Sequence, residues 1–440
     1  MRAYLLLMLI AAAVTYLATP GARWVARRTN AISAVRERDV HLLPTPRLGG
    51  LAMLVGIVVA VLIASQMSFL EGVFDNRQVW GIVGGAVIVC LLGWADDVWD
   101  LDWVTKLAGQ VLAAGFMALQ QVQLISLPTP GGPTIGSSRL SLVATVLVVV
   151  VAMNAVNFVD GLDGLAAGVV AIGGSAYFLY SYSLTQQNSP GDYASLATMT
   201  LAVLVGVCLG FLPHNFFPAH IFMGDSGSMV LGFLFAGASI TVTGNIDTSV
   251  NSGAQAVPAI LPLLLPLAVV LLPLLDMGMA VVRRVAAGKS PFHPDRMHLH
   301  HRMLALGHSH RRAVLILYVW TAVFAFGAAA LVRWHWHGVM IGLAAAVVVA
   351  VLLTLGPLRT RGRFLDDDVA SGALPTIVPV PVASPAAART PAAAPTPPAS
   401  VPPASRPGQP TLDQPTPDQP TPRPTTQPRS QQATHQGRAS

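Results

Sequence analysis

The sequence predicts an all-α polytopic integral membrane protein with about eleven transmembrane helices. Of its 440 residues, 53% are hydrophobic and only 10% are charged, and the mean hydropathy is +0.60. An average soluble domain has about 25% charged residues. Because a helix needs about 20 mostly apolar residues to span a bilayer, we expect spans at roughly 4–19, 48–65, 79–95, 104–121, 139–155, 165–183, 194–212, 227–244, 256–282, 313–332 and 338–356.

The basic residues predict how these spans are oriented. With the N-terminus outside, the loops 20–47 and 283–312 face the cytoplasm and carry six and seven Arg or Lys residues. The outer loops hold only Arg77, with Arg333 at a boundary. Since cytoplasmic loops are enriched in Lys and Arg, we expect the N-terminus outside and the C-terminus in the cytoplasm. The net charge of +6 is explained by these loops, so no nucleic-acid partner is expected.

The ninth span and the C-terminal segment differ from the rest of the chain. The stretch 256–282 contains four prolines, which predict a kinked or broken helix. Asp276, near its inner end, either lines a site or reaches the inner interface. From about residue 367 the composition becomes rich in Pro, Ala and Thr. We therefore expect residues 1–356 to form the transmembrane domain with its active-site loops, and 357–440 a disordered cytoplasmic tail.

A polar segment between the fifth and sixth spans is the central candidate site. Residues 154–165 (NAVNFVDGLDGL) place two amides and two carboxylates, those of Asp160 and Asp163, beside glycines and between apolar runs. Paired acids at a membrane are costly and usually functional. The alternative is a solvated turn that caps two helices.

Two further motifs fall on the same predicted side of the membrane. Asp96 and Asp97 end the third span, and neighbouring carboxylates usually have a cation or another positive partner nearby, although a solvated acidic loop is the alternative. The segment 222–228 (FMGDSGS) combines Asp225 with glycines and hydroxyls at the start of the eighth span. A helix N-terminus favours phosphate and a carboxylate favours Mg²⁺, although a plain helix cap is the alternative.

A fourth motif, 291–302 (PFHPDRMHLHHR), is rich in histidine and arginine. Histidine clusters can indicate zinc, but oxygen ligands dominate the other loops and the flanking arginines would repel a cation. Binding of diphosphate or sugar oxygens is the better interpretation. Together, the four motifs indicate phosphoryl transfer assisted by a divalent metal ion.

The motifs DD, NxxNxxDGLDGL, FMGDSGS and HxHH, in this order over residues 1 to about 356, resemble the polyprenyl-phosphate N-acetylhexosamine-1-phosphate transferase family (glycosyltransferase family 4). That family transfers a sugar 1-phosphate from a UDP-sugar to a lipid phosphate and releases UMP. The His-Leu-His-His sequence at 298–301 resembles the branch that uses UDP-GlcNAc. The branch that uses UDP-MurNAc-pentapeptide tends to have three consecutive histidines there.

The resemblance implies the substrates, the product and the location of the enzyme. UDP-GlcNAc and undecaprenyl or decaprenyl phosphate would give polyprenyl-diphosphate-GlcNAc, the first membrane intermediate of a cell-envelope glycan. The expected cofactor is Mg²⁺, with Mn²⁺ as the alternative. We expect a multi-pass plasma-membrane protein whose active site faces the cytoplasm, and the resemblance also implies a homodimer.

The resemblance also implies site residues, position by position. The catalytic carboxylates are those of Asp96, Asp97, Asp160 and Asp163. The metal ligands are Asp225 and Asp97. The nucleotide contacts are Asn157, Asn215, Phe222 and Lys106. The sugar and diphosphate contacts are Arg296, His298, His300 and His301. The first cytoplasmic loop, at the lipid phosphate, contributes His41 and Arg47.

Two other functions and one mechanistic choice stay open. Within the family, the alternative is the MurNAc-pentapeptide transferase of peptidoglycan synthesis. From another class, the alternative is an ion-coupled transporter, which would place acids near the bilayer midplane and show repeated halves. The lipid phosphate attacks the β-phosphorus directly, or the reaction passes through a phospho-aspartate at Asp96 or Asp97.

Overall fold

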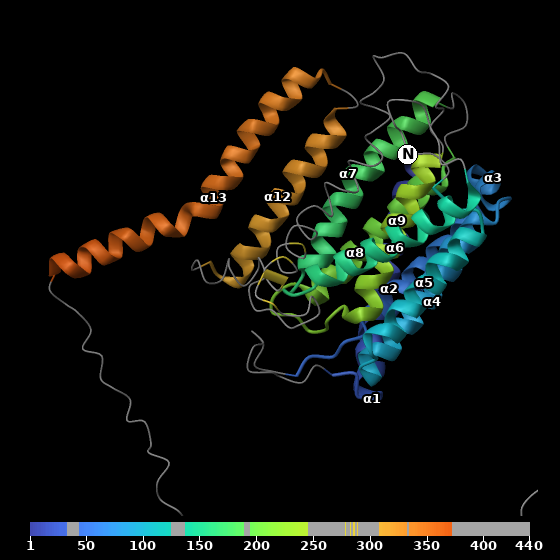
Figure 1. Ribbon diagram of the computed structural model, residues 1–440, viewed down its shortest axis with the longest axis horizontal. Helices are drawn as coiled ribbons and strands as arrows, with labels where there is room; N and C mark the ends of the chain where they lie inside the picture. The colour runs from blue at the N-terminus through green and yellow to red at the C-terminus, as the bar shows by residue number, and fades with distance from the viewer. Residues whose placement is uncertain are drawn as a thin grey trace, which may run out of the picture. The chain divides into compact units, whose positions relative to one another are not determined.

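The computed structural model describes residues 1–32, 44–124, 137–188, 194–244, 308–331 and 334–371, together with positions 278, 282, 285, 286 and 288. Side chains are described as far as residue 355. Within these ranges the regular elements are helices, and extended backbone pairs at only two isolated bridges (Figure 1). The predicted tail beyond Ser371 and most of the predicted ninth span lie outside the described residues.

The helices follow the predicted spans closely. They are α1 (Arg2–Arg28), α2 (Gly49–Ala64), η1 (Ser68–Leu70), α3 (Glu71–Phe74), α4 (Gln78–Trp99), α5 (Trp103–Leu119), α6 (Ser138–Val159), α7 (Leu165–Asn188), α8 (Leu196–Asn215), α9 (Gly224–Gly244), α12 (His310–Ala330) and α13 (Trp336–Ser371). Apart from the ninth, every predicted span coincides with one of these helices.

Length and composition agree with a membrane location. Among the described residues, eight helices are long and apolar enough to cross a bilayer. α2 with η1 and α3 makes a ninth candidate, bent by 95°, and α5 is a shorter apolar helix. The prediction of an all-α polytopic membrane protein is confirmed. The count of eleven spans and the orientation of the chain remain predictions.

Several helices extend beyond the apolar stretch that predicted them. α4 continues to Trp99, so Asp96 and Asp97 lie within the helix and not in the loop that follows it. In the same way, α6 includes Asn157 and α8 includes Asn215. Hydropathy marks the apolar part of a helix, whereas backbone hydrogen bonding can continue into polar residues. The polar motifs are therefore held on regular helix ends.

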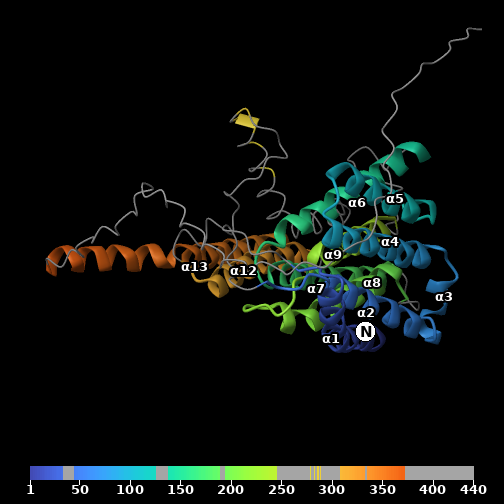
Figure 2. The same cartoon turned by 90° about the horizontal axis from the view of Figure 1, so that it is seen from below.

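α9 is the central helix of the described bundle. Its residues from Ser226 to Thr243 are all buried, and it packs against α2, α4, α6 and α8 (Figures 1 and 2). Gly50 of α2 and Gly93 of α4 face the α9 backbone at Gly227 and Ser226, and a Cβ atom at either glycine would overlap it. Small residues let helix backbones approach closely in membranes. The N-terminus of α9 is thereby fixed between α2 and α4.

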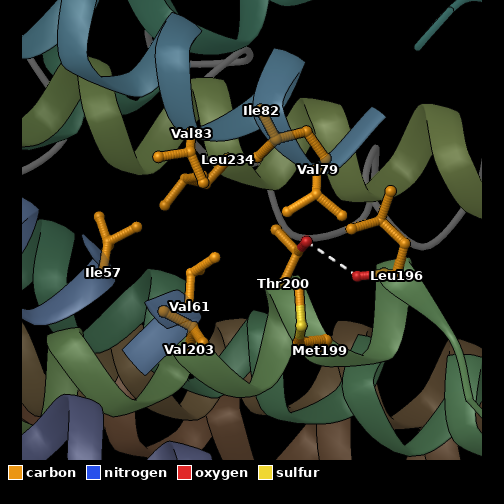
Figure 3. Close-up of a pocket in the computed structure, with 10 residues that line it drawn as sticks. All are labelled: Ile57, Val61, Val79, Ile82, Val83, Leu196, Met199, Thr200, Val203 and Leu234. Carbon is orange, nitrogen blue, oxygen red and sulfur yellow. Dashed lines mark hydrogen bonds between the residues drawn. The ribbon is translucent and has the colours of Figure 1, made fainter. Parts of the chain in front are cut away.

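A small apolar cavity of about 10 Å³ lies between α2, α4, α8 and α9 (Figure 3). Thr200 is the one polar residue in its lining, and its hydroxyl donates to the Leu196 carbonyl at 2.8 Å within α8. A space of this size holds about one water molecule, and a water needs several polar partners. We therefore regard this cavity as a packing gap of the core.

The remaining helices surround this core. α1 packs against α8 and α2, and α7 packs against α8. α12 packs on α7 and α13 on α12, whereas α5 packs on α4 and α6. α13 runs past the predicted span end at residue 356 as far as Ser371.

Candidate active site

Helix ends from distant parts of the chain meet at the candidate site. The C-terminal ends of α4, α6 and α8 and the N-terminal ends of α5 and α9 contribute its side chains. The turn before α7 joins them through Gly164. The fold thus brings most of the predicted motifs to one end of the bundle.

Asp97 binds the N-terminus of α9. Its Oδ1 accepts from the backbone N–H of Asp225 at 3.0 Å, and its Oδ2 accepts from that of Ser226 at 3.2 Å. The first N–H groups of a helix lack partners within the helix, and the helix dipole favours negative charge there. Gly224 has φ of +71°, and a Cβ atom at this position would overlap the Asp97 carboxylate. A glycine is therefore required for this close approach.

Lys106 joins two acidic residues from different helices. Its ammonium lies 3.2 Å from Oδ2 of Asp96 and also forms an ion pair with Oδ2 of Asp225. The position of Lys106 depends on the start of α5, where Asp102 accepts from the backbone N–H groups of Val104 at 3.0 Å and Thr105 at 3.1 Å. This cap ends the short α4–α5 connection and points the first turn of α5 at the site.

Asp225 receives donors from two sides. The Nδ2 group of Asn157 donates to Oδ1 of Asp225 at 2.9 Å and also contacts Oγ of Ser228 at 2.9 Å. Lys106 holds the other carboxylate oxygen. Asp225 is the point at which α4, α5, α6 and α9 are connected, since Asp97 accepts from its backbone N–H.

The turn that follows α6 is anchored by a second set of hydrogen bonds. Asp163 is 2% exposed, and its Oδ2 accepts from the backbone N–H of Ala219 at 2.9 Å. Gly164 donates its N–H to Oδ1 of Asn215 at 3.1 Å and accepts from the Tyr318 hydroxyl through its carbonyl. The positive φ of +77° at Gly164 favours glycine. These bonds hold the Asp160–Gly164 turn against α8 and α12.

Asp160 and Arg47 contribute through their charges. Removal from water and the nearby Asp97 and Asp163 raise the pKa of Asp160 to about 7, although Arg47 opposes this shift. Arg47 reaches the site because its backbone forms a parallel bridge with Phe222. The Phe222 N–H donates to the Pro46 carbonyl at 2.8 Å, which ties the first cytoplasmic loop to the start of α9.

The structure thus brings together most of the residues predicted from the sequence. Direct contacts join Asp96, Asp97, Lys106, Asn157 and Asp225. Asn215 is 2% exposed, and its side chain forms hydrogen bonds with the backbone of two connecting segments. Its Oδ1 accepts from Gly164, and its Nδ2 group donates to the Ile221 carbonyl at 3.0 Å. Its predicted nucleotide contact stays a prediction, as does that of Phe222.

Some predicted residues cannot be located, and one contributor was missed. His41, Arg296, His298, His300 and His301 lie outside the described residues. Tyr318 was missed because it lies in an apolar run with no polar motif around it, 154 positions from the carbonyl that it bonds.

The donor chemistry of the site fits a hard cation. Within the described ranges, no three His, Cys, Asp or Glu side chains lie close enough together to hold a metal ion. However, the carboxylates of Asp96 and Asp225 already share one positive charge, that of Lys106. Carboxylate and amide oxygens suit Mg²⁺, which usually binds through one or two carboxylates and substrate phosphates. A magnesium ion bound to Asp225 is therefore compatible with these residues.

Comparison with known proteins identifies the family of the chain. Residues 79–243 match the model of glycosyl transferase family 4. The match runs from the second residue of α4 to the last but one residue of α9. The chain is 44% identical over 376 residues to the decaprenyl-phosphate N-acetylglucosaminephosphotransferase of Mycobacterium tuberculosis (84% of this chain, 93% of the relative).

Two more distant relatives are named for reactions on different sugars or lipids, and the chain resembles both less than it resembles the mycobacterial protein. A probable undecaprenyl-phosphate N-acetylglucosaminyl 1-phosphate transferase of Bacillus subtilis is 30% identical over 70% of this chain and 80% of its own length. A phospho-N-acetylmuramoyl-pentapeptide-transferase of Corynebacterium aurimucosum is 35% identical but covers 45% of this chain and 63% of its own length. Together with the family match and the mycobacterial relative, these similarities establish that the chain belongs to glycosyl transferase family 4.

Proposed function

We propose that this protein transfers N-acetylglucosamine 1-phosphate from UDP-GlcNAc to polyprenyl phosphate. The products are polyprenyl-diphosphate-GlcNAc and UMP, and the lipid product starts the assembly of a cell-envelope glycan. The observation that carries this proposal is the group of carboxylates around one lysine at the N-terminus of α9. The names of the similar proteins support the same reaction.

In this reaction an oxygen of the lipid phosphate attacks the β-phosphorus of UDP-GlcNAc, and the bond between that phosphorus and the bridging oxygen breaks. The departing UMP takes the bridging oxygen and its negative charge. Lys106 attracts the diphosphate, because its ammonium presents positive charge beside the N-terminus of α9. Asp96 and Asp225 orient Lys106, and Asp96 or Asp97 helps to deprotonate or position the lipid phosphate. A one-step and a two-step route remain alternatives.

The metal ion and the remaining contacts complete the proposal. Asp225 and Asp97 would hold Mg²⁺, with Mn²⁺ as the alternative, and the bound ion would supply positive charge to the diphosphate. Asn157 and Phe222 contact the nucleotide, and the histidine loop 291–302 contacts the sugar. The distribution of basic loop residues supports a plasma-membrane enzyme with its site at the cytoplasmic face. The homodimer remains an implication of family membership.

UDP-GlcNAc is preferred over UDP-MurNAc-pentapeptide for two reasons. The His-Leu-His-His sequence lacks three consecutive histidines. The relatives named for N-acetylglucosamine also align over more of this chain than the muramoyl-pentapeptide relatives do. We propose decaprenyl phosphate as the acceptor, because that lipid is named in the relatives that are 44% identical.

An ion-coupled transporter is disfavoured by the placement of the acids. Among the described side chains, every Asp and Glu lies at a helix end or in a connection, and none lies in the middle of a long apolar helix. A proton relay through the membrane would require acids at intermediate depth.

The proposal is tested by UMP release from the purified protein in detergent with Mg²⁺. Decaprenyl and undecaprenyl phosphate are each offered with UDP-GlcNAc or with UDP-MurNAc-pentapeptide. We expect UMP from UDP-GlcNAc alone, with the faster rate for decaprenyl phosphate. UMP from the pentapeptide donor alone would support the proposed phosphoryl transfer but would show that UDP-GlcNAc is not the donor. No release from either donor by folded protein would refute the proposed reaction.

A further inference from the structure

Two amide side chains, one buried and one partly buried, lie one helical turn inside the candidate site. Gln110 of α5 is 1% exposed, and its Oε1 accepts from Nδ2 of Asn154 on α6 at 2.8 Å. The Nε2 group of Gln110 also donates to Sδ of Met229 on α9 at 3.2 Å. These contacts join three helices at one level of the bundle. Neither amide belongs to the roles assigned above.

This inner level lies directly beneath the site. Each of its residues is three or four positions from a site residue on the same helix, and residues with this spacing lie on one helix face. The pairs are Gln110 with Lys106, Asn154 with Asn157, and Met229 with Asp225. The two levels therefore repeat the same arrangement of α5, α6 and α9.

The contact between α5 and α9 depends on side chains. α5 packs mainly on α4 and α6, whereas α9 packs on α2, α4, α6 and α8. Side chains that reach from α5 to α9 connect Lys106 with Asp225, Gln110 with Met229, and Met117 with Gly237. The distance from Lys106 to Asp225 therefore depends on how the first turns of α5 are held.

Amides are costly at this depth in a membrane protein. A buried amide without a hydrogen bond is strongly unfavourable, and intramembrane polar residues commonly serve function. Two apolar side chains of similar size would pack α5 against α6 without this cost. However, they would not fix the rotation of α5, because apolar contacts have no direction whereas a hydrogen bond does.

We propose that Gln110 and Asn154 are positioning residues that set the distance and orientation of Lys106 and Asn157 relative to Asp225. The inference rests on the proposed function, in which Lys106 acts on the diphosphate. A displacement of about 1 Å at a reacting centre can lower a rate by about 10²-fold. The pair therefore acts on turnover more than on substrate affinity.

Variants that keep the shape but remove the hydrogen bond test this proposal. We expect Gln110→Met and Asn154→Leu each to lower kcat about 10-fold or more, with KM for UDP-GlcNAc within threefold of wild type. The double variant should lose less than the product of the two single losses, because the contact between Gln110 and Asn154 is counted in both, whereas the bonds of Gln110 to Met229 and of Asn154 to Val150 are separate. The exchanged pair Gln110→Asn with Asn154→Gln should recover kcat to within about threefold of wild type.

A matched control separates positioning from general loosening of the helices. Met117 is fully buried and lies two turns further along α5 from Gln110, against Gly237. Met117→Ala should lower the melting temperature at least as much as Gln110→Met, yet leave kcat within about twofold of wild type. If kcat falls equally in the two variants, the pair has only a structural role and the proposal is wrong.

A second measurement does not depend on turnover. Lys106 and Lys289 are the two lysines of the sequence, so Lys289 serves as an internal reference for acetylation followed by mass spectrometry. We expect Gln110→Met to raise the acetylation rate of Lys106 threefold or more, and Met117→Ala to leave it within twofold. An unchanged rate would overturn the proposal. Absence of UMP release by wild type would instead refute the proposed function, and the acetylation result would still decide the positioning role.

Discussion

Replacement of Lys106 by methionine tests the electrostatics of the site. Its ammonium lies 3.2 Å from Asp96 and also pairs with Asp225, and all three side chains are less than one third exposed. At an effective dielectric constant of about 20, two charges at this distance interact by about 5 kcal/mol. A diphosphate oxygen at a similar distance from the ammonium gains a similar energy, and lost hydration reduces the net effect to about 3 kcal/mol in the transition state.

A loss of about 3 kcal/mol corresponds to about 10²-fold in kcat/KM. The assay is UMP release from UDP-GlcNAc at saturating polyprenyl phosphate, with the melting temperature measured in parallel. Lys106→Arg is the control that keeps the charge and should retain more activity than Lys106→Met. A kcat/KM of Lys106→Met within threefold of wild type, in folded protein, would refute the assignment of Lys106 to the diphosphate.

Three further predictions concern the surroundings of the site. Gly93→Ala would force a Cβ atom into the backbone of α9 and should destabilise the protein by about 1–3 kcal/mol, whereas Gly115→Ala, which meets open space, should not lower the melting temperature. The pKa of Asp160 is raised to about 7 from 3.8, so between these values the unfolded chain releases a proton that the folded protein keeps. The stability of the metal-free protein should therefore fall as pH rises from about 4 to about 7. Melting curves of Asp160→Asn should show a smaller dependence on pH. Tyr318→Phe removes the hydroxyl bond to Gly164 and should cost about 1 kcal/mol in thermal unfolding; no change in stability would contradict that contact.

The sequence was sufficient to predict the apolar helices and several polar residues that the structure brings together, whose roles in the reaction remain predictions. Hydropathy identifies spans because the bilayer requires long apolar segments, and α4, α6 and α9 all occur where it predicted them. The acids Asp97 and Asp225 were identifiable because charged groups are rare at the ends of such segments. Hydropathy could not show that α4 continues to Trp99 with its acids on a helix.

Contacts between distant segments could not be predicted from local patterns. The bridge between Arg47 and Phe222 joins positions 175 residues apart. The Tyr318 hydroxyl of α12 donates to the carbonyl of Gly164, in the turn between α6 and α7. The composition around Gln110 likewise gives no sign that it contacts Asn154. Such contacts follow from how the helices pack together, and a single sequence records that packing only indirectly.

The central claim is that the charged cluster at the N-terminus of α9 carries out the transfer. The most direct measurement is the amount of polyprenyl-diphosphate-GlcNAc formed, followed by mass spectrometry, in wild type, Asp225→Asn and Asp100→Asn. Asp100 is exposed with φ of +52°, a conformation that asparagine also tolerates. We predict wild-type product formation in Asp100→Asn and a loss of at least about 10²-fold in Asp225→Asn. Product formation at a wild-type rate by Asp225→Asn would contradict this account of the site.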